Sequence, residues 1–363
     1  MKGDKESADS SASLDLLLSR AQQWTPDATL QRITTIDAHT AGEPLRIVLA
    51  GYPQIAGKTV LERRAFAREH LDHLRTALMW EPRGHADMYG CLVIPPNTDD
   101  ADFGVLFTHN EGYSSMCGHG IIAVVTALVE TGAIEISPPD REIRIDAPAG
   151  RITARPRIVD GRVESVSFEN VASFVVELDA KVDVPGLGHL RYDLAFGGAY
   201  YAFVQGDQLD PPIRCLPDEC ERMIAVARKI KQAVIDSREI KHPFEPDLSF
   251  LYGVIFVAPP QDAENHSRNC CVFADGEVDR SPTGTGVAGR AAIHHARGEL
   301  ALQQSLCIES VLGTCFDVAA MREVTFGPHK AIIPRVSGQA FITGRHEFLI
   351  DPRDPLRDGF LLR

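Results

Sequence analysis

The hydrophobic and polar positions of this chain follow two periods, which predict strands interspersed with helices. Runs rich in β-branched and apolar residues predict strands over 32–36 and 45–49, with a turn-rich segment between them. A second group of strands is predicted between residues 141 and 176, where Asp160-Gly161 has the composition of a tight hairpin turn. Further strands are expected over 250–257, 270–273 and within 336–350.

Apolar residues at helical spacing predict helices between these strands. Thr59 and Glu62 have the spacing of a capping box, and Asp218 is expected to cap a second, long amphipathic helix. The first of these is expected to be one continuous helix, with a buried face made by Leu61, Ala65, Leu71, Leu74 and Leu78. The buried face of the second is expected to carry Met223, Ile224, Ala227, Ile230 and Val234. Separate helices among antiparallel strand patterns favour an α+β fold.

Two segments far apart in the chain are similar to each other. Residues 116–120 read Met-Cys-Gly-His-Gly and precede the apolar run 121–129, while residues 281–286 read Ser-Pro-Thr-Gly-Thr-Gly and precede 287–293. Each is a small polar residue followed by Gly-x-Gly and then a helix. The first helix is apolar nearly all round, as a helix enclosed by a sheet would be. The pair predicts a pseudo-duplication, with two lobes that each have a central helix.

Composition and charge exclude several classes of function. The 363 residues suit two domains, and 44% apolar and 24% charged residues are ordinary for a globular protein. The net charge is −13, from 37 basic and 50 acidic residues, so nucleic-acid and anionic-membrane partners are not expected. No apolar run reaches the ~20 residues of a membrane span. The first 28 residues predict a solvated tail, with a short helix over 14–24 and neither a secretory nor a transit signal, so a cytoplasmic location is expected.

The eight cysteines show no Cys-x-x-Cys or Cys/His zinc spacing, so most are expected to be buried thiols and no metal site is expected. Cys117 is different because it stands at the start of a predicted helix with His119 close by. A helix N-terminus lowers a thiol pKa from ~8.5, which favours a thiolate base or nucleophile. A buried structural thiol fits the local sequence equally well. Both Gly-x-Gly turns suit a carboxylate or phosphate, and neither continues into the Gly-Lys-Ser/Thr of a Walker loop.

Four motifs together resemble the proline racemase family. They are Asp-Ala-His-Thr-Ala-Gly-Glu-Pro at 37–44, Arg-Gly-His-Ala-Asp-Met-Tyr-Gly at 83–90, Asn-Glu-Gly-Tyr-Ser-Ser-Met-Cys-Gly-His-Gly at 110–120, and Asp-Arg-Ser-Pro-Thr-Gly-Thr-Gly at 279–286. The resemblance extends from about Ile33 to the C-terminus. It implies a fold like that of diaminopimelate epimerase, with two α/β lobes, each a curled and mostly antiparallel sheet around a central helix. It also implies a homodimer.

The division expected on this basis has a tail over 1–28, an N-terminal lobe over 29–195 completed by 345–363, and a C-terminal lobe over 196–344. In the racemases and epimerases of the family, two cysteines face opposite sides of the substrate α-carbon. Cys117 matches the first, but Thr283 stands where the second would be. A threonine hydroxyl has no thiol-like acidity near neutral pH, so stereoinversion is not expected.

With one base, abstraction of the α-proton by Cys117 leads to loss of a 3-hydroxyl as water. The resemblance therefore implies a hydro-lyase that dehydrates trans-3-hydroxy-L-proline to Δ1-pyrroline-2-carboxylate and needs no cofactor. The amides of Gly118, His119, Gly284 and Thr285 are expected to hold the substrate carboxylate. Asp279 is expected to pair with the ring ammonium, with His119 bonding to the same region and Thr283 holding or protonating the leaving hydroxyl.

Two other functions stay open. A 4-hydroxyproline epimerase or proline racemase would need another acid in place of Thr283. A non-catalytic amino-acid binding protein would use the same carboxylate pocket without turnover. A cysteine hydrolase is not favoured because no triad accompanies Cys117 and His119. His85 and Asp87 are interpreted as structural rather than as metal ligands, and so are His294 and His295 at the end of the second central helix.

Overall fold

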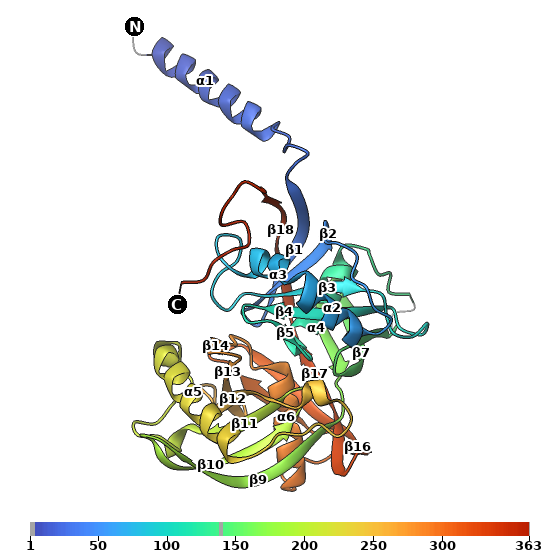
Figure 1. Ribbon diagram of the computed structural model, residues 1–363, viewed down its shortest axis with the longest axis vertical. Coiled ribbons are helices and arrows are strands. Elements are labelled where there is room, and N and C mark those ends of the chain that lie inside the picture. The colour runs from blue at the N-terminus through green and yellow to red at the C-terminus, as the bar shows by residue number, and fades with distance from the viewer. Residues whose placement is uncertain (1–3, 138–140, 363) are drawn as a thin grey trace.

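Two helices of 13 residues each lie inside rings of strands in the computed structural model, which describes residues 4–137 and 141–362 (Figure 1). They are α4 (Gly118–Glu130) and α6 (Gly284–Ala296). Residues 118–127 of α4 and 284–293 of α6 are all buried. A helix without an exposed face favours small or apolar residues on every side. The two repeated segments supply them except at His119 and at Arg290, whose guanidinium donates to Asn269.

The remaining elements fall into two lobes, and the first lobe carries the extra helices near the N-terminus. Its strands are β1 (Gln31–Thr40), β2 (Glu43–Ala50), β3 (Tyr89–Ile94), β4 (Phe103–His109), β5 (Tyr113–Ser114), β6 (Ile143–Ala147), β7 (Gly150–Val159), β8 (Arg162–Glu169) and β18 (Ala340–Ile350). Its other helices are α2 (Val60–His70) and α3 (Asp72–Met79), and α1 (Asp4–Gln22) projects away from the lobe in Figure 1.

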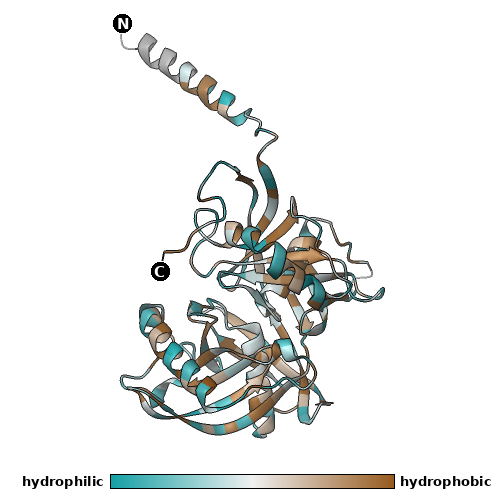
Figure 2. Ribbon diagram, viewed as in Figure 1, coloured by the Kyte–Doolittle hydropathy of each residue, from teal (hydrophilic) through white to brown (hydrophobic). Residues whose placement is uncertain are grey.

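The second lobe contains the longest amphipathic helix. Its strands are β9 (Ser173–Val184), β10 (Gly188–Phe196), β11 (Tyr200–Gln205), β12 (Leu251–Ala258), β13 (Ser267–Phe273), β14 (Glu277–Val278), β15 (Ser305–Glu309), β16 (Cys315–Phe326) and β17 (His329–Gly338). Helix α5 (Cys220–Ser237) packs on its outside, and short 3₁₀ turns cover Gly206–Gln208, Pro217–Glu219 and Pro246–Leu248. In Figure 2 polar and apolar residues alternate along α5, as expected for a helix with one face in solvent.

Strand pairing makes the two lobes equivalent. In the first lobe the order is β18-β1-β2-β3-β4-β6-β7-β8, and α4 packs against β1, β2, β7, β8 and β18. In the second the order is β9-β10-β11-β12-β13-β15-β16-β17, and the ring closes because β17 pairs again with β9. Each lobe has two parallel pairs, β2–β3 and β4–β6 in one and β11–β12 and β13–β15 in the other.

The same succession of elements therefore occurs twice: β3-β4-β5-α4-β6-β7-β8, then β12-β13-β14-α6-β15-β16-β17. This confirms the predicted α+β class, the mostly antiparallel sheets and the two pseudo-symmetric lobes. β17 joins the lobes, since its end pairs with β8 at Arg335–Gly338. The lobe boundary predicted at 195/196 stays a prediction. Because β9 and β10 pack on α6, we propose that the chain changes lobe nearer to residue 171, between β8 and β9.

Several local predictions are confirmed and others are wrong. The Thr59–Glu62 capping box and the Asp160-Gly161 hairpin are present. However, the predicted continuous helix is two helices that meet at Leu71, whose backbone is not helical.

The pattern failed there because arginines, not leucines, fill part of the buried face of α2. Arg63 and Arg64 are buried and donate to the carbonyl oxygens of Pro95 and Tyr113, whereas the predicted Ala65 is exposed.

Two helix starts also differ from the predictions. Asp218 lies within the 3₁₀ turn before α5, and the N-cap of α5 is Glu219, which makes no side-chain cap hydrogen bond. The N-terminal helix α1 begins at Asp4 instead of residue 14 and exposes its leucines, which fits a solvated segment. No helix among residues 4–137 and 141–362 is long and apolar enough to cross a membrane.

Candidate active site

The N-termini of the two central helices meet at the junction of the lobes. A Cβ atom on Gly118 would lie 2.5 Å from the Cα of Gly284, and a Cβ on Gly284 would lie 2.5 Å from the Cα of Gly118. Neither position has room for a side chain, so both glycines are required for this approach. The first N–H groups of each helix have no partner within the helix and carry positive partial charge. The two helices therefore direct two sets of N–H donors, including those of Gly118, His119, Gly284 and Thr285, toward one place.

Cys117 is the N-cap of α4 and is only 5% exposed. Its Sγ accepts the N–H of Gly120 at 3.2 Å and lies 3.2 Å from Nδ1 of His119. The other ring nitrogen, Nε2, lies 3.2 Å from the carbonyl oxygen of Pro44. A carbonyl only accepts, so Nε2 carries the proton of the neutral imidazole and Nδ1 is left to accept the thiol proton. The arrangement is a neutral thiol next to a base that is oriented to receive its proton.

Burial decides the protonation of this pair. Burial raises the pKa of the Cys117 thiol well above its usual range, and the N–H of Gly120 opposes this only in part. The nearby carboxyl groups of Asp279 and Glu43 raise the thiol pKa further. Burial also lowers the pKa of His119 to about 3. The lowered thiol pKa expected from the helix N-terminus is therefore wrong for the closed protein, because one N–H donor does not compensate for the loss of water.

Thr283 occupies the position in α6 that Cys117 occupies in α4, immediately before Gly-x-Gly. Its backbone has φ 66°, which is unusual for a β-branched residue and typical of strained functional positions. Thr283 is held there by its N–H, which donates to Oγ of Ser281 at 3.1 Å. Its own Oγ1 is buried next to the Asp279 carboxyl and the Cys271 thiol and lowers the pKa of both, but it makes no hydrogen bond of ordinary length and angle within the described part of the chain. This hydroxyl is available to a ligand.

Asp279 lies just before this loop, directly after β14. Its Oδ1 accepts the N–H of Ser281 at 2.7 Å, and its own N–H donates to the carbonyl of Cys271 at 3.0 Å. Burial raises the pKa of the Asp279 carboxyl to about 6, although the hydrogen bonds from Ser281 lower it. A buried carboxylate without a bound cation is destabilised, so this site favours a positively charged ligand.

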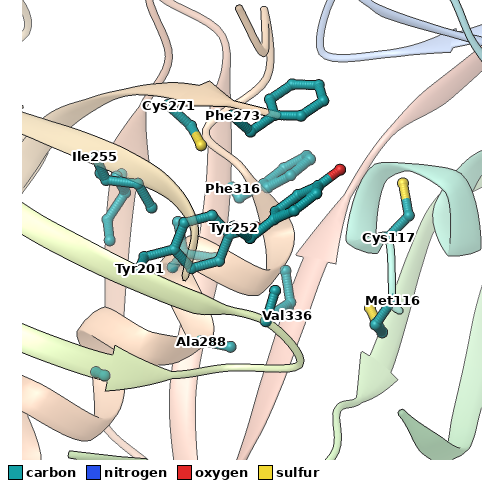
Figure 3. Packing of buried hydrophobic residues seen from close by; sticks show 14 of the residues in the cluster. Met116, Cys117, Tyr201, Tyr252, Ile255, Cys271, Phe273, Ala288, Phe316 and Val336 are labelled. Carbon is teal, nitrogen blue, oxygen red and sulfur yellow. The ribbon is translucent and has the colours of Figure 1, made fainter. Parts of the chain in front are cut away.

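A small cavity brings the predicted residues together. Cys117, Gly118, His119, Asp279, Thr283, Gly284 and Thr285 all line it, together with Tyr89, Met116, Tyr201, Tyr252 and Phe273. Its volume is about 20 Å³, which holds about one water molecule. The lobes must therefore separate before any larger ligand enters. Figure 3 shows the Tyr252 hydroxyl directed toward the end of α4 that carries Cys117.

The aromatic lining was not predicted from the sequence. Tyr201 donates to or accepts from the hydroxyl of Thr285 at 2.7 Å, and Tyr89 donates to Ser114 at 2.5 Å. Tyr89 belongs to the 83–90 motif, which was a usable signal, but Tyr201 and Tyr252 lie in ordinary strand patterns. Their contribution appears only once strands from both halves of the chain are brought to one place.

Other candidates lie elsewhere. His85 is exposed and hydrogen-bonds to the neighbouring carbonyl of Ala86, while His294 pairs with Glu299. Cys271 is fully buried in β13 next to the Thr283 side chain, which lowers the pKa of its thiol, and it does not line the cavity. Within residues 4–137 and 141–362, no group of three or more His, Cys, Asp or Glu side chains is arranged to hold a metal ion.

Comparisons with known proteins agree on one family. The family model for proline racemase matches residues 35–361. The chain is 46% identical to a trans-3-hydroxy-L-proline dehydratase of Colwellia psychrerythraea, over 94% of this chain and 97% of the relative. It is 45% identical to a 3-hydroxyproline 2-epimerase of Burkholderia multivorans, over 91% and 98%. A hydroxyproline epimerase from Agrobacterium vitis with bound trans-4-hydroxy-L-proline superposes with a TM-score of 0.85 at 31% identity, over 92% and 96%. The chain belongs to the proline racemase family.

Proposed function

We propose that the protein is a hydro-lyase that dehydrates trans-3-hydroxy-L-proline to Δ1-pyrroline-2-carboxylate. The observation that carries this proposal is the pair of equivalent helix N-caps, one a cysteine and the other a threonine, facing one cavity. Relatives of 44–46% identity that bear the name trans-3-hydroxy-L-proline dehydratase support the same substrate.

Binding of the substrate uses charges that the closed site already provides. Its carboxylate is held by the N–H groups of Gly118, His119, Gly284 and Thr285. Its ring ammonium pairs with Asp279, which gives the buried carboxylate the cation it lacks. Both contacts draw electron density from the α-carbon and so acidify the α-proton. This is how the reaction proceeds without a cofactor in the proposed mechanism.

Proton removal then falls to Cys117. In the unliganded site the thiol keeps its proton, because burial raises its pKa and lowers the pKa of His119. Once the substrate ammonium offsets the Asp279 charge, which opposes the thiolate, the thiol gives its proton to Nδ1 of His119 and the thiolate takes the α-proton of the substrate. The electron pair of the broken Cα–H bond forms the Cα–Cβ double bond as the 3-hydroxyl leaves. Thr283 Oγ1 is proposed to hold the departing oxygen, which takes the proton that His119 received from Cys117 and leaves as water, so that thiol and imidazole both return to their starting states. The enamine product tautomerises to the pyrroline by taking a proton at C3 and releasing the one on nitrogen.

The absence of inversion follows from the acidity of the second group. A threonine hydroxyl is far less acidic than a thiol near neutral pH, so we infer that a carbanion at the α-carbon is not reprotonated from the Thr283 side. A substrate with a hydroxyl on the adjacent carbon therefore loses water instead of undergoing inversion.

The test is incubation with trans-3-hydroxy-L-proline, trans-4-hydroxy-L-proline and L-proline, each followed by NMR. Conversion of only the first, to a pyrroline, supports the proposal. Epimerisation of the 3-hydroxy or 4-hydroxy substrate without loss of water would make the protein an epimerase, as the name of the Burkholderia relative would suggest. Binding without any turnover would favour an amino-acid binding protein instead.

Further properties are proposed on the same basis. We propose that the enzyme acts as a homodimer in the cytoplasm, with small imino acids as its ligands and without nucleic-acid or membrane partners. The acidic net charge of −13 supports the last point. Sedimentation of the purified protein would test the dimer.

A further inference from the structure

The turn between β1 and β2 touches both halves of the active site, although it contributes no lining residue. We propose that this turn, residues 40–44 and here called the hairpin tip, latches the two lobes together, and that Glu43 is a positioning residue that fixes Asp279 relative to Cys117. The inference rests on the proposed function only in the roles given to Cys117 and Asp279.

On one side the hairpin tip is attached to the start of α4 in its own lobe. The hydroxyl of Thr40 donates to the carbonyl of His119 at 2.9 Å, and the carbonyl of Pro44 faces Nε2 of His119 at 3.2 Å. The second contact sets the proton position on His119 and leaves Nδ1 for Cys117. The hairpin tip therefore orients the pair that we propose removes the α-proton.

On the other side the hairpin tip is attached to the opposite lobe. Oε2 of Glu43 accepts the backbone N–H of Arg280 at 2.7 Å, which is the residue after Asp279. The hydroxyl of Thr314, in the turn between β15 and β16, donates to the carbonyl of Ala41 at 2.8 Å. A Cβ on Gly42 would lie 2.5 Å from Cδ1 of Leu312, so the two turns are in close contact. All three contacts cross between lobes and must break when the cleft opens.

Glu43 has the properties of a group built for this position. It is fully buried, and its Oε1 has no hydrogen-bond partner among the described residues. Burial, with the neighbouring Asp279 carboxyl, raises the pKa of Glu43 well above its usual range and so favours its neutral form. A neutral carboxyl accepts the Arg280 N–H without adding a second charge next to Asp279. Asp279 thus remains the group that a substrate ammonium meets.

The Arg280 side chain extends the same contact. Its guanidinium lies 3.7 Å from Oε2 of Glu43 and 3.4 Å from Oδ2 of Asp87, and it donates to the Asp87 carbonyl at 3.2 Å. Glu43 and Asp87 belong to the first lobe and Arg280 to the second. Closure of the lobes therefore assembles this cluster and positions the Asp279 loop in one step. This contact between the lobes also gives a role to the motif at residues 37–44, none of which has a catalytic role in the proposed mechanism.

The test measures how often the cleft opens, through the rate at which iodoacetamide alkylates Cys117, followed by peptide mass spectrometry. The thiol is 5% exposed in the closed protein, so alkylation requires opening. Loss of one hydrogen bond of this kind favours the open state by about five- to tenfold. Glu43→Ala and Thr314→Val are expected to speed alkylation, about five- to tenfold for the first. Glu43→Gln, which keeps the acceptor and the neutral charge, is expected to restore the wild-type rate.

Glu347→Ala is the matched control, because Glu347 forms a partly exposed ion pair with Arg32 within one lobe. Thr314→Val leaves the groups around Cys117 unchanged, so faster alkylation in that variant reports opening and not a change in thiol acidity. Folded Glu43→Ala and Thr314→Val proteins that are alkylated at the wild-type rate would overturn the proposal. The assay needs no substrate, so its failure is distinguishable from failure of the dehydratase proposal. In the active enzyme, Glu43→Ala is also expected to raise KM more than it lowers kcat, and Glu43→Gln is expected to reverse this.

Discussion

Replacing Asp279 by asparagine is expected to stabilise the protein and inactivate it at the same time. Asparagine has nearly the same shape, and its Oδ1 still accepts the N–H of Ser281. What the substitution removes is a buried negative charge. In the proposed mechanism that charge holds the substrate ammonium. Activity therefore requires an ionised Asp279, which destabilises the folded protein when no substrate is bound.

The magnitude follows from the raised pKa. The carboxyl titrates at about 6 in the fold against 3.8 in the unfolded chain, which is roughly two units. Each unit corresponds to about 1.4 kcal/mol, so ionised Asp279 destabilises the folded state by about 3 kcal/mol. The pKa of Asp279 is higher in the folded state than in the unfolded chain, so protonated Asp279 favours folding. This contribution to stability is complete below pH 3.8 and is lost as the pH rises through about 6. The variant is therefore expected to match the wild type at low pH and to exceed it at pH 8.

Thermal unfolding of both proteins between pH 4 and pH 8 measures this effect. A difference of about 3 kcal/mol corresponds to about 4 °C in Tm for a chain of 363 residues. The same variant should lose about 100-fold in kcat/KM, as expected for removal of one partner of a buried charge pair. Wild-type kcat/KM should fall as the pH decreases below about 6, where Asp279 becomes protonated.

Asp351→Asn is the control, because hydrogen bonds from Arg353 lower the pKa of the exposed Asp351 carboxyl to about 2. That substitution should give no gain in Tm at pH 8 and should leave turnover unchanged. If Asp279→Asn were no more stable than the wild type at pH 8, other groups in the fold would already compensate the charge of the Asp279 carboxylate, and the reasoning would be refuted. If it kept full activity, the ammonium would be held elsewhere.

Three other substitutions test the remaining parts of the site. Cys117→Ala should abolish turnover and keep the fold, as checked by circular dichroism, and retained dehydration would disprove the assignment of the base. Thr283→Cys should introduce epimerisation detectable by chiral chromatography, and strictly one-faced exchange in that variant would contradict the opposed-face geometry. Gly284→Ala places a Cβ 2.5 Å from the Cα of Gly118, so the lobes must move apart by about 1 Å and kcat should fall about 100-fold. Gly344→Ala, whose Cβ meets only the end of the His346 side chain, should keep wild-type kcat.

Much of the fold was predictable because it depends on local patterns. The two Gly-x-Gly helix starts and the apolar run of α4 predicted central helices, and the strand runs predicted antiparallel sheets. The burial of Arg63 and Arg64 on α2 was not predictable, since it depends on both side chains reaching carbonyl oxygens of residues far along the chain. Side chains that are buried by such distant partners leave no hydrophobic period in the sequence.

The candidate site divides in the same way. Cys117, Thr283 and Asp279 were identified from motifs, and the structure brings them to one cavity. The direction of the thiol pKa shift was mispredicted, because a sequence indicates a helix N-terminus but not the loss of water around it. Glu43 was quoted only as part of a motif, since its contact with Arg280 joins residues from opposite lobes.

In the proposed mechanism one base acts on one face of the α-carbon. The most direct measurement is the reaction of trans-3-hydroxy-L-proline in deuterated water, stopped at partial conversion, with NMR of both the product and the remaining substrate. A single base on one face is expected to give a pyrroline that carries deuterium at C3, and remaining substrate that keeps its configuration at the α-carbon. Remaining substrate with inverted configuration and deuterium at the α-carbon would show a second proton donor on the Thr283 side and would disprove the one-base mechanism.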